Sequence, residues 1–176
     1  DIDVHVVVPD AASKTIGDGV HQTDKGIRFG VTRLKEITTY YRKPGFKDFR
    51  KTVLALHPDV LVMNWPYYLM LLFYPRLRWQ LKSRKVKLVV REIPFTLPAW
   101  NESFKEFGKT AVEAQKNDRL FTSRMAFYGH KLVWKILYSR IFHAAMCYTS
   151  DGKRILGSYG MPVNRVHTVH NSIDNE

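Results

Sequence analysis

The feature of this sequence that most constrains its fold is a series of short apolar runs, rich in β-branched residues, that alternate with segments of helical spacing. The runs are Val4–Val8, Val60–Met63, Lys87–Arg91, Ala144–Thr149 and Val166–Val169, and a more polar extended run covers Ile27–Leu34. Strands that are apolar along their whole length are typical of a parallel sheet covered on both faces. We therefore predict an α/β fold in which a parallel sheet carries helices on both faces.

The segments between these runs predict helices. They are Phe46–His57, Tyr67–Lys85 with a kink or split at Pro75, Asn101–Asn117, Asp118–His143, and a short helix that is capped by Ser150–Asp151, runs to Tyr159 and ends at Gly160. With 176 residues, of which 45% are apolar, the chain is long enough to bury a core as one domain. A single cysteine, Cys147, excludes a disulfide framework within it.

The charge of the chain is strongly positive, because 28 Lys and Arg stand against 16 Asp and Glu, a formal net charge of +12. Two long stretches contain no acidic residue at all, one between Asp59 and Glu92 and the other between Asp118 and Asp151. A positive field of this kind attracts nucleic acid, anionic lipid or phosphorylated ligands, although solvated helix faces would show the same charge.

The second acid-free stretch carries its cations on one helical stripe. The stripe comprises Arg124, Lys131 and Lys135, with Tyr128 beside it. Val133, Leu137 and Ile141 lie on the opposite side of the same helix and are expected to face a core. Cations beside amphipathic rings suit a layer of lipid headgroups, so we predict an anionic membrane surface as partner. Stacking on nucleic-acid bases is the alternative, but the sequence has no RNA-binding signature and we expect no nucleic-acid partner.

The last third of the chain follows a recognisable order of segments. A strand ends at Ser150, a helix carries Lys153, a turn follows at Gly160-Met161-Pro162, and a last strand leads into His170-Asn171-Ser172-Ile173-Asp174. This order resembles the end of the N-terminal domain of family-4 glycosyltransferases, which have the GT-B fold. In that family the last loop usually reads Pro-Asn-Gly-Ile/Val-Asp, so His170 and Ser172 depart from the pattern.

Two earlier segments agree with this resemblance, which covers most of the chain. His57–Asn64 is similar to the family's Pro-Asp-Val strand, and Lys87–Pro94 is similar to its Val-x-x-His-Asp-x-x-Pro strand. Asn64 and Arg91 stand where the family commonly has histidine. The family's glycine-rich loop, first strand and second domain have no counterpart in the sequence.

The resemblance implies a Rossmann-like domain over residues 1–170, followed by the start of an interdomain linker at residues 171–176. It implies the acceptor-binding half of a nucleotide-sugar-dependent glycosyltransferase that transfers a hexose with retention, in glycan, polysaccharide or glycolipid synthesis. The acceptor would be a sugar or a lipid-linked sugar, and the location cytoplasmic, peripheral at the inner face of a membrane. We expect no cofactor in this chain, because the nucleotide-sugar would bind to the second domain, and we expect the chain alone to be inactive.

Ligands of open α/β sheets bind at the carboxyl ends of the strands, which gives the candidate site residues. The catalytic candidates are Arg91 and Glu92; the acceptor-binding candidates are Asn64, Trp65 and Asp10; and the candidates for the donor or interdomain cleft are Ser150, Lys153, Asn171 and Ser172. Arg91 can hold a phosphate or carboxylate in a bidentate fork while Glu92 orients an acceptor hydroxyl. The alternatives are a local ion pair for Arg91 and Glu92, and a core anchor role for Trp65.

The sequence is also compatible with other functions. The seven histidines contain no His-x-x-x-His pair, so we predict no metal site. A basic α/β module that binds nucleic acid, or half of another Rossmann-like sugar-nucleotide enzyme such as an epimerase, would share the fold class.

Overall fold

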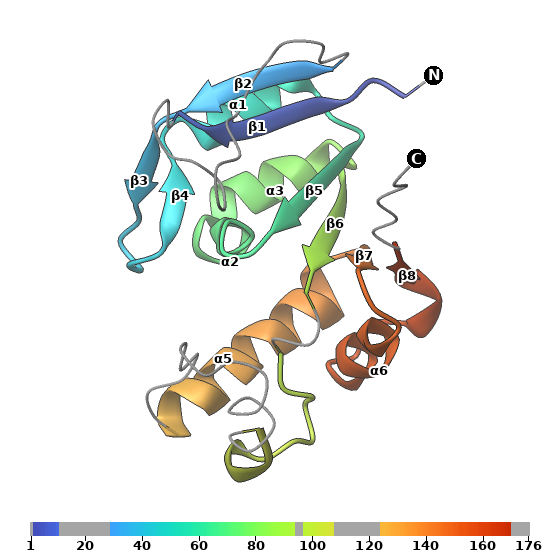
Figure 1. The fold of residues 1–176 in the computed structure, drawn as a ribbon. Helices are drawn as coiled ribbons and strands as arrows, with labels where there is room; N and C mark the ends of the chain where they lie inside the picture. The colour runs from blue at the N-terminus through green and yellow to red at the C-terminus, as the bar shows by residue number, and fades with distance from the viewer. Residues whose placement is uncertain (1, 11–28, 94–96, 108–123, 170–176) are drawn as a thin grey trace, which may run out of the picture. The chain divides into compact units, whose positions relative to one another are not determined.

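The computed structural model describes residues 2–10, 29–93, 97–107 and 124–169. The chain divides into two compact units, Asp1–Pro58 and Asp59–Glu176, each with its own parallel strands (Figure 1).

The described residues of the first unit form a two-stranded parallel sheet, a hairpin and one helix. The strands β1 (His5–Pro9) and β2 (Gly30–Leu34) pair from His5 opposite Gly30 to Pro9 opposite Leu34. Helix α1 (Phe49–Leu56) follows, and it buries Phe49 and Val53. The strands predicted at 4–8 and 27–34 are confirmed, but they begin at His5 and Gly30; Ile27 and Arg28 lie outside the described residues.

A hairpin in this unit was not expected from the sequence. Its strands are β3 (Glu36–Thr38) and β4 (Pro44–Phe46), which pair in antiparallel fashion. The predicted helix from Phe46 consequently starts three residues later, after Asp48, whose positive φ of 59° separates the hairpin from α1. All three residues of β3 are exposed, so the run has no apolar side that would mark it as a strand.

The second unit is built on a four-stranded, wholly parallel sheet in the order β5-β6-β7-β8. The strands are β5 (Val60–Asn64), β6 (Lys87–Glu92), β7 (Ala144–Cys147) and β8 (Val166–Thr168). The four corresponding apolar runs predicted these strands correctly. The unit is thus α/β, with a parallel sheet flanked by helices, an arrangement compatible with a Rossmann-like fold.

The helices of this unit fill the connections between consecutive strands. They are α2 (Leu69–Phe73), α3 (Pro75–Ser83), α5 (Arg124–Ile136), the π-helical turn η2 (Leu137–Ile141), α6 (Asp151–Ser158) and the short 3₁₀ turn η3 (Val163–Arg165). As predicted, Pro75 splits the first helical segment, and it starts α3. Of the helix predicted at 101–117, residues 104–107 are helical, residues 101–103 are not, and residues 108–117 lie outside the described residues.

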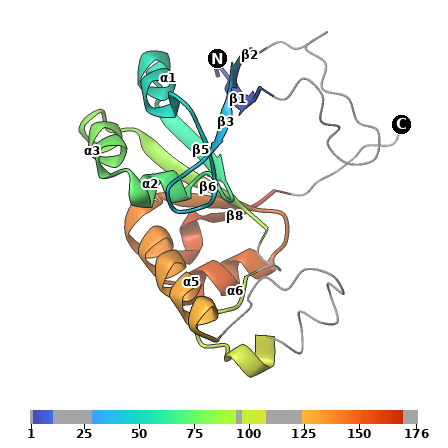
Figure 2. The ribbon, with the colours of Figure 1, turned by 90° about the vertical axis from the view of Figure 1, so that its left-hand side faces the viewer.

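The two faces of this sheet differ in their cover. Each strand lies beside its predecessor, so right-handed crossovers place α3, α5 and α6 on the same face, as Figure 2 shows. Leu88, Val90 and Ala145 are buried on that helix-covered face. On the other face Val60 and Val62 remain 52% and 48% exposed, and we call it the open face. The helices expected on a second face are not among the described residues of this unit.

Candidate functional site

The carboxyl edge of the four-stranded sheet brings two of the predicted site residues together. Asn64 ends β5 and is the register partner of Arg91 on β6. Partners in neighbouring strands point to the same face, so both side chains lie on the open face, and both are exposed. Asn64 and Arg91 are distant in the sequence but adjacent in the sheet. They form a polar pair at the edge where α/β sheets bind ligands.

The guanidinium of Arg91 is held by an aromatic ring. Its Cζ lies 5.0 Å from the ring centroid of Tyr148, which follows β7. Within the part of the chain that the structure describes, this guanidinium forms no hydrogen bond or ion pair. A cation–π contact fixes the plane of the group and leaves its N–H donors available to an anionic or hydroxylated ligand.

Glu92 points the opposite way from Arg91, because successive residues of a strand alternate between faces. Its side chain lies on the helix-covered face and is only 4% exposed. The local ion pair between Arg91 and Glu92 that the sequence left open therefore does not form. The direct contact of Glu92 with an acceptor hydroxyl stays a prediction, and its environment is that of a buried carboxyl group.

Two tyrosines donate to this buried carboxyl. The hydroxyl of Tyr138 donates to Oε2 of Glu92 at 2.6 Å, and the hydroxyl of Tyr68 donates to the same oxygen at 2.9 Å. The backbone N–H of Ile93 donates to Oε1 at 3.2 Å, and the indole Nε1 of Trp134 donates to the Tyr68 hydroxyl at 3.2 Å. The π turn η2 carries Tyr138, so the local widening of the helix contributes one of the two donors.

The ionisation of this cluster follows from its burial. Burial raises the pKa of Glu92, and the hydrogen bonds from Tyr138, Tyr68 and the Ile93 N–H oppose that rise. Burial and the neighbouring Glu92 charge raise the pKa of both tyrosines well above the ordinary value. Burial likewise raises the pKa of the nearby Cys147 thiol to about 11, so this cysteine is a neutral buried group, as the sequence suggested.

A raised pKa at Glu92 predicts a pH dependence of stability. The folded state holds the Glu92 proton more tightly than the unfolded state, so the stabilisation is complete below the unfolded pKa and is lost as pH rises through the folded pKa. The free energy of unfolding of the wild type, measured relative to Glu92→Gln by denaturant titration, should therefore increase as the pH is lowered from 8 towards 5. If the difference in unfolding free energy between the wild type and Glu92→Gln stayed constant across this pH range, the raised pKa of Glu92 would be contradicted.

Trp65 belongs to the aromatic cluster around Glu92 and is half-buried. Its ring centroid lies 5.6 Å from that of Tyr68 and 6.4 Å from that of Trp134. The wider cluster contains Trp65, Tyr68, Trp134, Tyr138, Phe142 and Tyr159. These contacts favour the core-anchor interpretation of Trp65 over direct stacking on a sugar.

The remaining predicted cleft residues are distributed along the chain. Ser150 and Lys153 are exposed at the start of α6, and the Ser150 side chain makes no capping hydrogen bond, contrary to its expected role. Asp10 is exposed and directly follows β1 in the first unit. Asn171 and Ser172 lie outside the described residues.

The expectation that Lys131 belongs to an exposed basic stripe is wrong. Its side chain is 3% exposed, and its Nζ donates to the backbone oxygen of Glu102 at 2.7 Å. The same Nζ lies 5.1 Å, 5.6 Å and 5.7 Å from the ring centroids of Phe127, Trp100 and Tyr128. The ammonium is therefore enclosed by aromatic rings and a carbonyl oxygen.

The other residues of the predicted basic stripe differ in their exposure to solvent. Arg124 and Tyr128 are exposed, whereas Lys135 is half-buried, with its Nζ 5.3 Å from the ring centroid of Trp100. Burial lowers the pKa of Lys131, and the carboxylates of Glu102 and Glu106 oppose this effect. The buried residues of this helix are those at 127, 131, 134, 137, 138 and 141, a helical stripe in which Lys131 takes an interior place.

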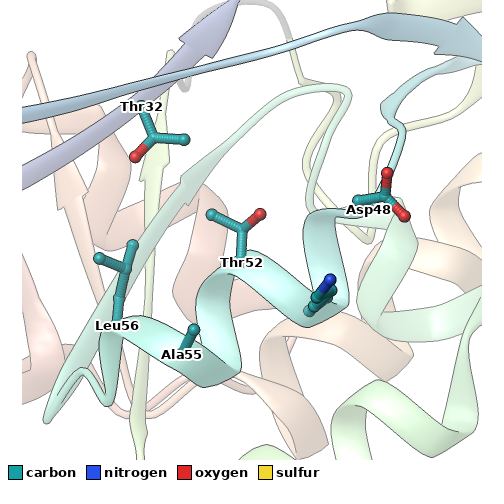
Figure 3. Close-up of a pocket in the computed structure, with 6 residues that line it drawn as sticks. Thr32, Asp48, Thr52, Ala55 and Leu56 are labelled. Carbon is teal, nitrogen blue, oxygen red and sulfur yellow. The ribbon is translucent and has the colours of Figure 1, made fainter.

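The first unit contains a shallow pocket of about 420 Å³ between β2 and α1 (Figure 3). Its lining consists of Thr32, Asp48, Lys51, Thr52, Ala55 and Leu56. Oγ1 of Thr32 shares a hydrogen bond of 2.7 Å with Nε2 of His5. Two hydroxyls beside an exposed carboxylate and ammonium suit a small polar ligand, but no residue predicted from the sequence to bind substrate lines this pocket.

Neither a cluster of metal ligands nor a membrane-spanning helix is found among the described residues. Residues 2–10, 29–93, 97–107 and 124–169 contain no group of three or more His, Cys, Asp or Glu side chains placed to hold a metal ion. Among those same residues, no helix has the length and apolar character needed to cross a membrane.

The fold and the edge site together define the class as an α/β protein with a polar pair at the carboxyl edge of a parallel sheet. Comparisons with models of protein families, with curated proteins and with solved structures found no match.

Proposed function

We propose that this chain is the acceptor-binding half of a nucleotide-sugar-dependent glycosyltransferase of GT-B type. The observation that carries the proposal is the Asn64–Arg91 pair on the open face, at the carboxyl edge of a parallel sheet. The strands that carry the two residues lie in the segments that resemble the family-4 pattern.

The pair offers chemistry that suits an acceptor. The carboxamide of Asn64 can both donate to and accept from a sugar hydroxyl, and the guanidinium of Arg91 can bind a phosphate or carboxylate of the acceptor through two parallel hydrogen bonds. Tyr148 holds the guanidinium in place, which lowers the entropy lost on binding. The donor nucleotide-sugar would bind to a second domain and face this edge.

In this proposal Glu92 stabilises the carboxyl edge of the sheet from the helix-covered face, opposite to the Asn64–Arg91 pair. It follows Arg91 on β6 and is bound by tyrosines from the segments before α2 and after α5. Three chain segments are thereby tied together directly beneath the carboxyl edge. This is a positioning role, distinct from contact with the acceptor, and it accounts for a carboxyl group on the helix-covered face.

The test is sugar transfer by the natural protein that contains this chain, with a panel of nucleotide-sugars and acceptor extracts. Arg91→Ala should lower turnover by about a hundredfold, the range seen when one positioned donor is removed from a site. Arg91→Lys should recover only part of the loss, because an ammonium cannot form the bidentate contact. The matched control is Arg140→Ala, which removes an exposed arginine elsewhere in the same unit.

Arg91→Ala and Arg91→Lys should both melt within a few degrees of the wild type, because an exposed residue at the end of a strand contributes little to the core. Wild-type turnover in a folded Arg91→Ala variant would refute the role of Arg91. Absence of transfer from every nucleotide-sugar would refute the proposed function, and so would transfer by residues 1–176 alone.

A further inference from the structure

Helix α3 presents an exposed tryptophan at the centre of its outer face. Trp79 is 67% exposed, whereas Leu77 and Leu81 of the same helix are buried. At about 100° per residue, Trp79 projects from the side opposite to these two leucines. A large apolar ring so placed contributes nothing to the core of the unit that carries it.

Cations surround this tryptophan and no anion accompanies them. Arg76 and Lys82 lie three residues before and after Trp79, and Lys85 follows the helix; all three are exposed. Their side chains form no hydrogen bond or ion pair with the described residues of the protein. The sequence from Val60 to Arg91 contains no Asp or Glu, so no carboxylate of this stretch competes for them.

We propose that this face of α3, defined by Arg76, Trp79, Lys82 and Lys85, docks on an anionic lipid bilayer. An indole ring suits the boundary between headgroups and acyl chains, and arginine and lysine stems can run along that boundary while their charged ends meet lipid phosphates. The surface is separate from the Asn64–Arg91 pair, so the inference does not depend on the proposed function.

A bilayer fits this face better than a nucleic acid does. Proteins that hold single strands use a basic groove with several aromatic rings for successive bases. Here one ring stands on the outer, convex side of a single helix, between cations placed before and after it. This geometry matches a flat anionic surface. It also moves the membrane contact away from α5, whose central lysine is buried.

The experiment measures binding of the full chain to two kinds of vesicle, phosphatidylcholine alone and phosphatidylcholine mixed with phosphatidylserine, and in parallel to a single-stranded oligonucleotide. The wild type should bind only the vesicles with phosphatidylserine. Binding should weaken as the ionic strength rises to about 0.15 M, where the screening length is about 8 Å.

Two variants test the face itself. Arg76→Glu, Lys82→Glu and Lys85→Glu combined should lower the vesicle partition coefficient at least about a hundredfold. Trp79→Ala should lower it about tenfold or more while leaving the salt dependence in place. The matched control combines Lys35→Glu, Lys47→Glu and Lys105→Glu, an equal charge change at exposed lysines outside α3, and should bind within a few-fold of the wild type.

Circular dichroism and thermal unfolding verify that each variant is folded, as expected for changes at exposed positions. The proposal is overturned if the wild type does not bind the anionic vesicles, or if the folded triple variant on α3 binds them as well as the control does. Binding of the oligonucleotide that depends on the same three cations, without vesicle binding, would show a nucleic-acid surface instead.

Discussion

Replacing both Tyr68 and Tyr138 with phenylalanine should lower the free energy of unfolding by about 3 kcal/mol near neutral pH. The two hydroxyls are the side-chain donors to a carboxyl group that is 4% exposed, and leaving a buried acceptor without its donor costs about 1–3 kcal/mol, and more when the acceptor is charged. Among the described residues, the double variant leaves Glu92 with the backbone N–H of Ile93 as its remaining hydrogen-bond donor. The carboxyl can respond by taking up a proton, which limits the loss.

The pH dependence separates this effect from a simple loss of packing. Once Glu92 is protonated, the missing hydrogen bonds are those of a neutral group, so the destabilisation should shrink at acidic pH. The matched control is Tyr159→Phe, which removes a buried hydroxyl that donates to the Pro98 carbonyl oxygen at 2.7 Å. It should lose only about 1 kcal/mol, with little dependence on pH. Equal losses in the double variant and the control would mean that the hydroxyls of Tyr68 and Tyr138 stabilise the fold no more than an ordinary buried hydroxyl does.

The second large effect is expected at Lys131. Lys131→Glu should lower the free energy of unfolding by about 3 kcal/mol or abolish folding. A carboxylate there would meet the carbonyl oxygen of Glu102 and the electron-rich faces of Phe127 and Trp100, all of which now face an ammonium. Lys131→Met retains the length and apolar stem of the side chain and should cost about 1 kcal/mol.

The comparison that decides this prediction is with Arg124→Glu, on the same helix but exposed. This change should alter stability by less than about 0.5 kcal/mol. Chemical denaturation of the three variants measures the differences. Similar stability of Lys131→Glu and Arg124→Glu would mean that Lys131 faces solvent.

The strands of the second unit could be predicted because their apolar runs are continuous and are separated by clear breaks. Val60–Met63 and Lys87–Arg91 required no knowledge of their neighbours. The hairpin of β3 and β4 could not be predicted in this way, because its exposed strand β3 lacks an apolar pattern and Pro44 and Gly45 are poor strand formers.

The position of the site could be predicted from the sequence, but the hydrogen-bond partners of Glu92 could not. That Asn64 and Arg91 meet follows from two parallel strands that end at the same edge. The placement of Arg91 and Glu92 on opposite faces follows from strand alternation, which was a usable signal. The two tyrosine donors could not be found from the sequence, because Tyr68 and Tyr138 are 24 and 46 residues from Glu92.

The burial of Lys131 could have been predicted from the helical spacing around it. The positive charge of its side chain led instead to the prediction of an exposed position. Phe127 lies four residues before it and Trp134 three residues after it, which is the spacing of one buried helical face. A lysine between two such residues is interior when its ammonium has partners. Here one of those partners, Trp100, comes from a distant part of the chain, which the local pattern does not show.

The π turn from Leu137 to Ile141 places one extra residue in the helical segment that precedes β7. The N–H of Phe142 donates to the Leu137 carbonyl at 3.0 Å, a bond that spans one residue more than an α-helical turn. Because this turn holds one residue more than an α-helical turn, deleting one exposed residue here would let an ordinary helix close with the flanking buried residues near their present positions. Ser139 and Arg140 are exposed, so the loss of one of them removes no core side chain. In an alignment of related chains, a gap of one residue is therefore expected within this turn.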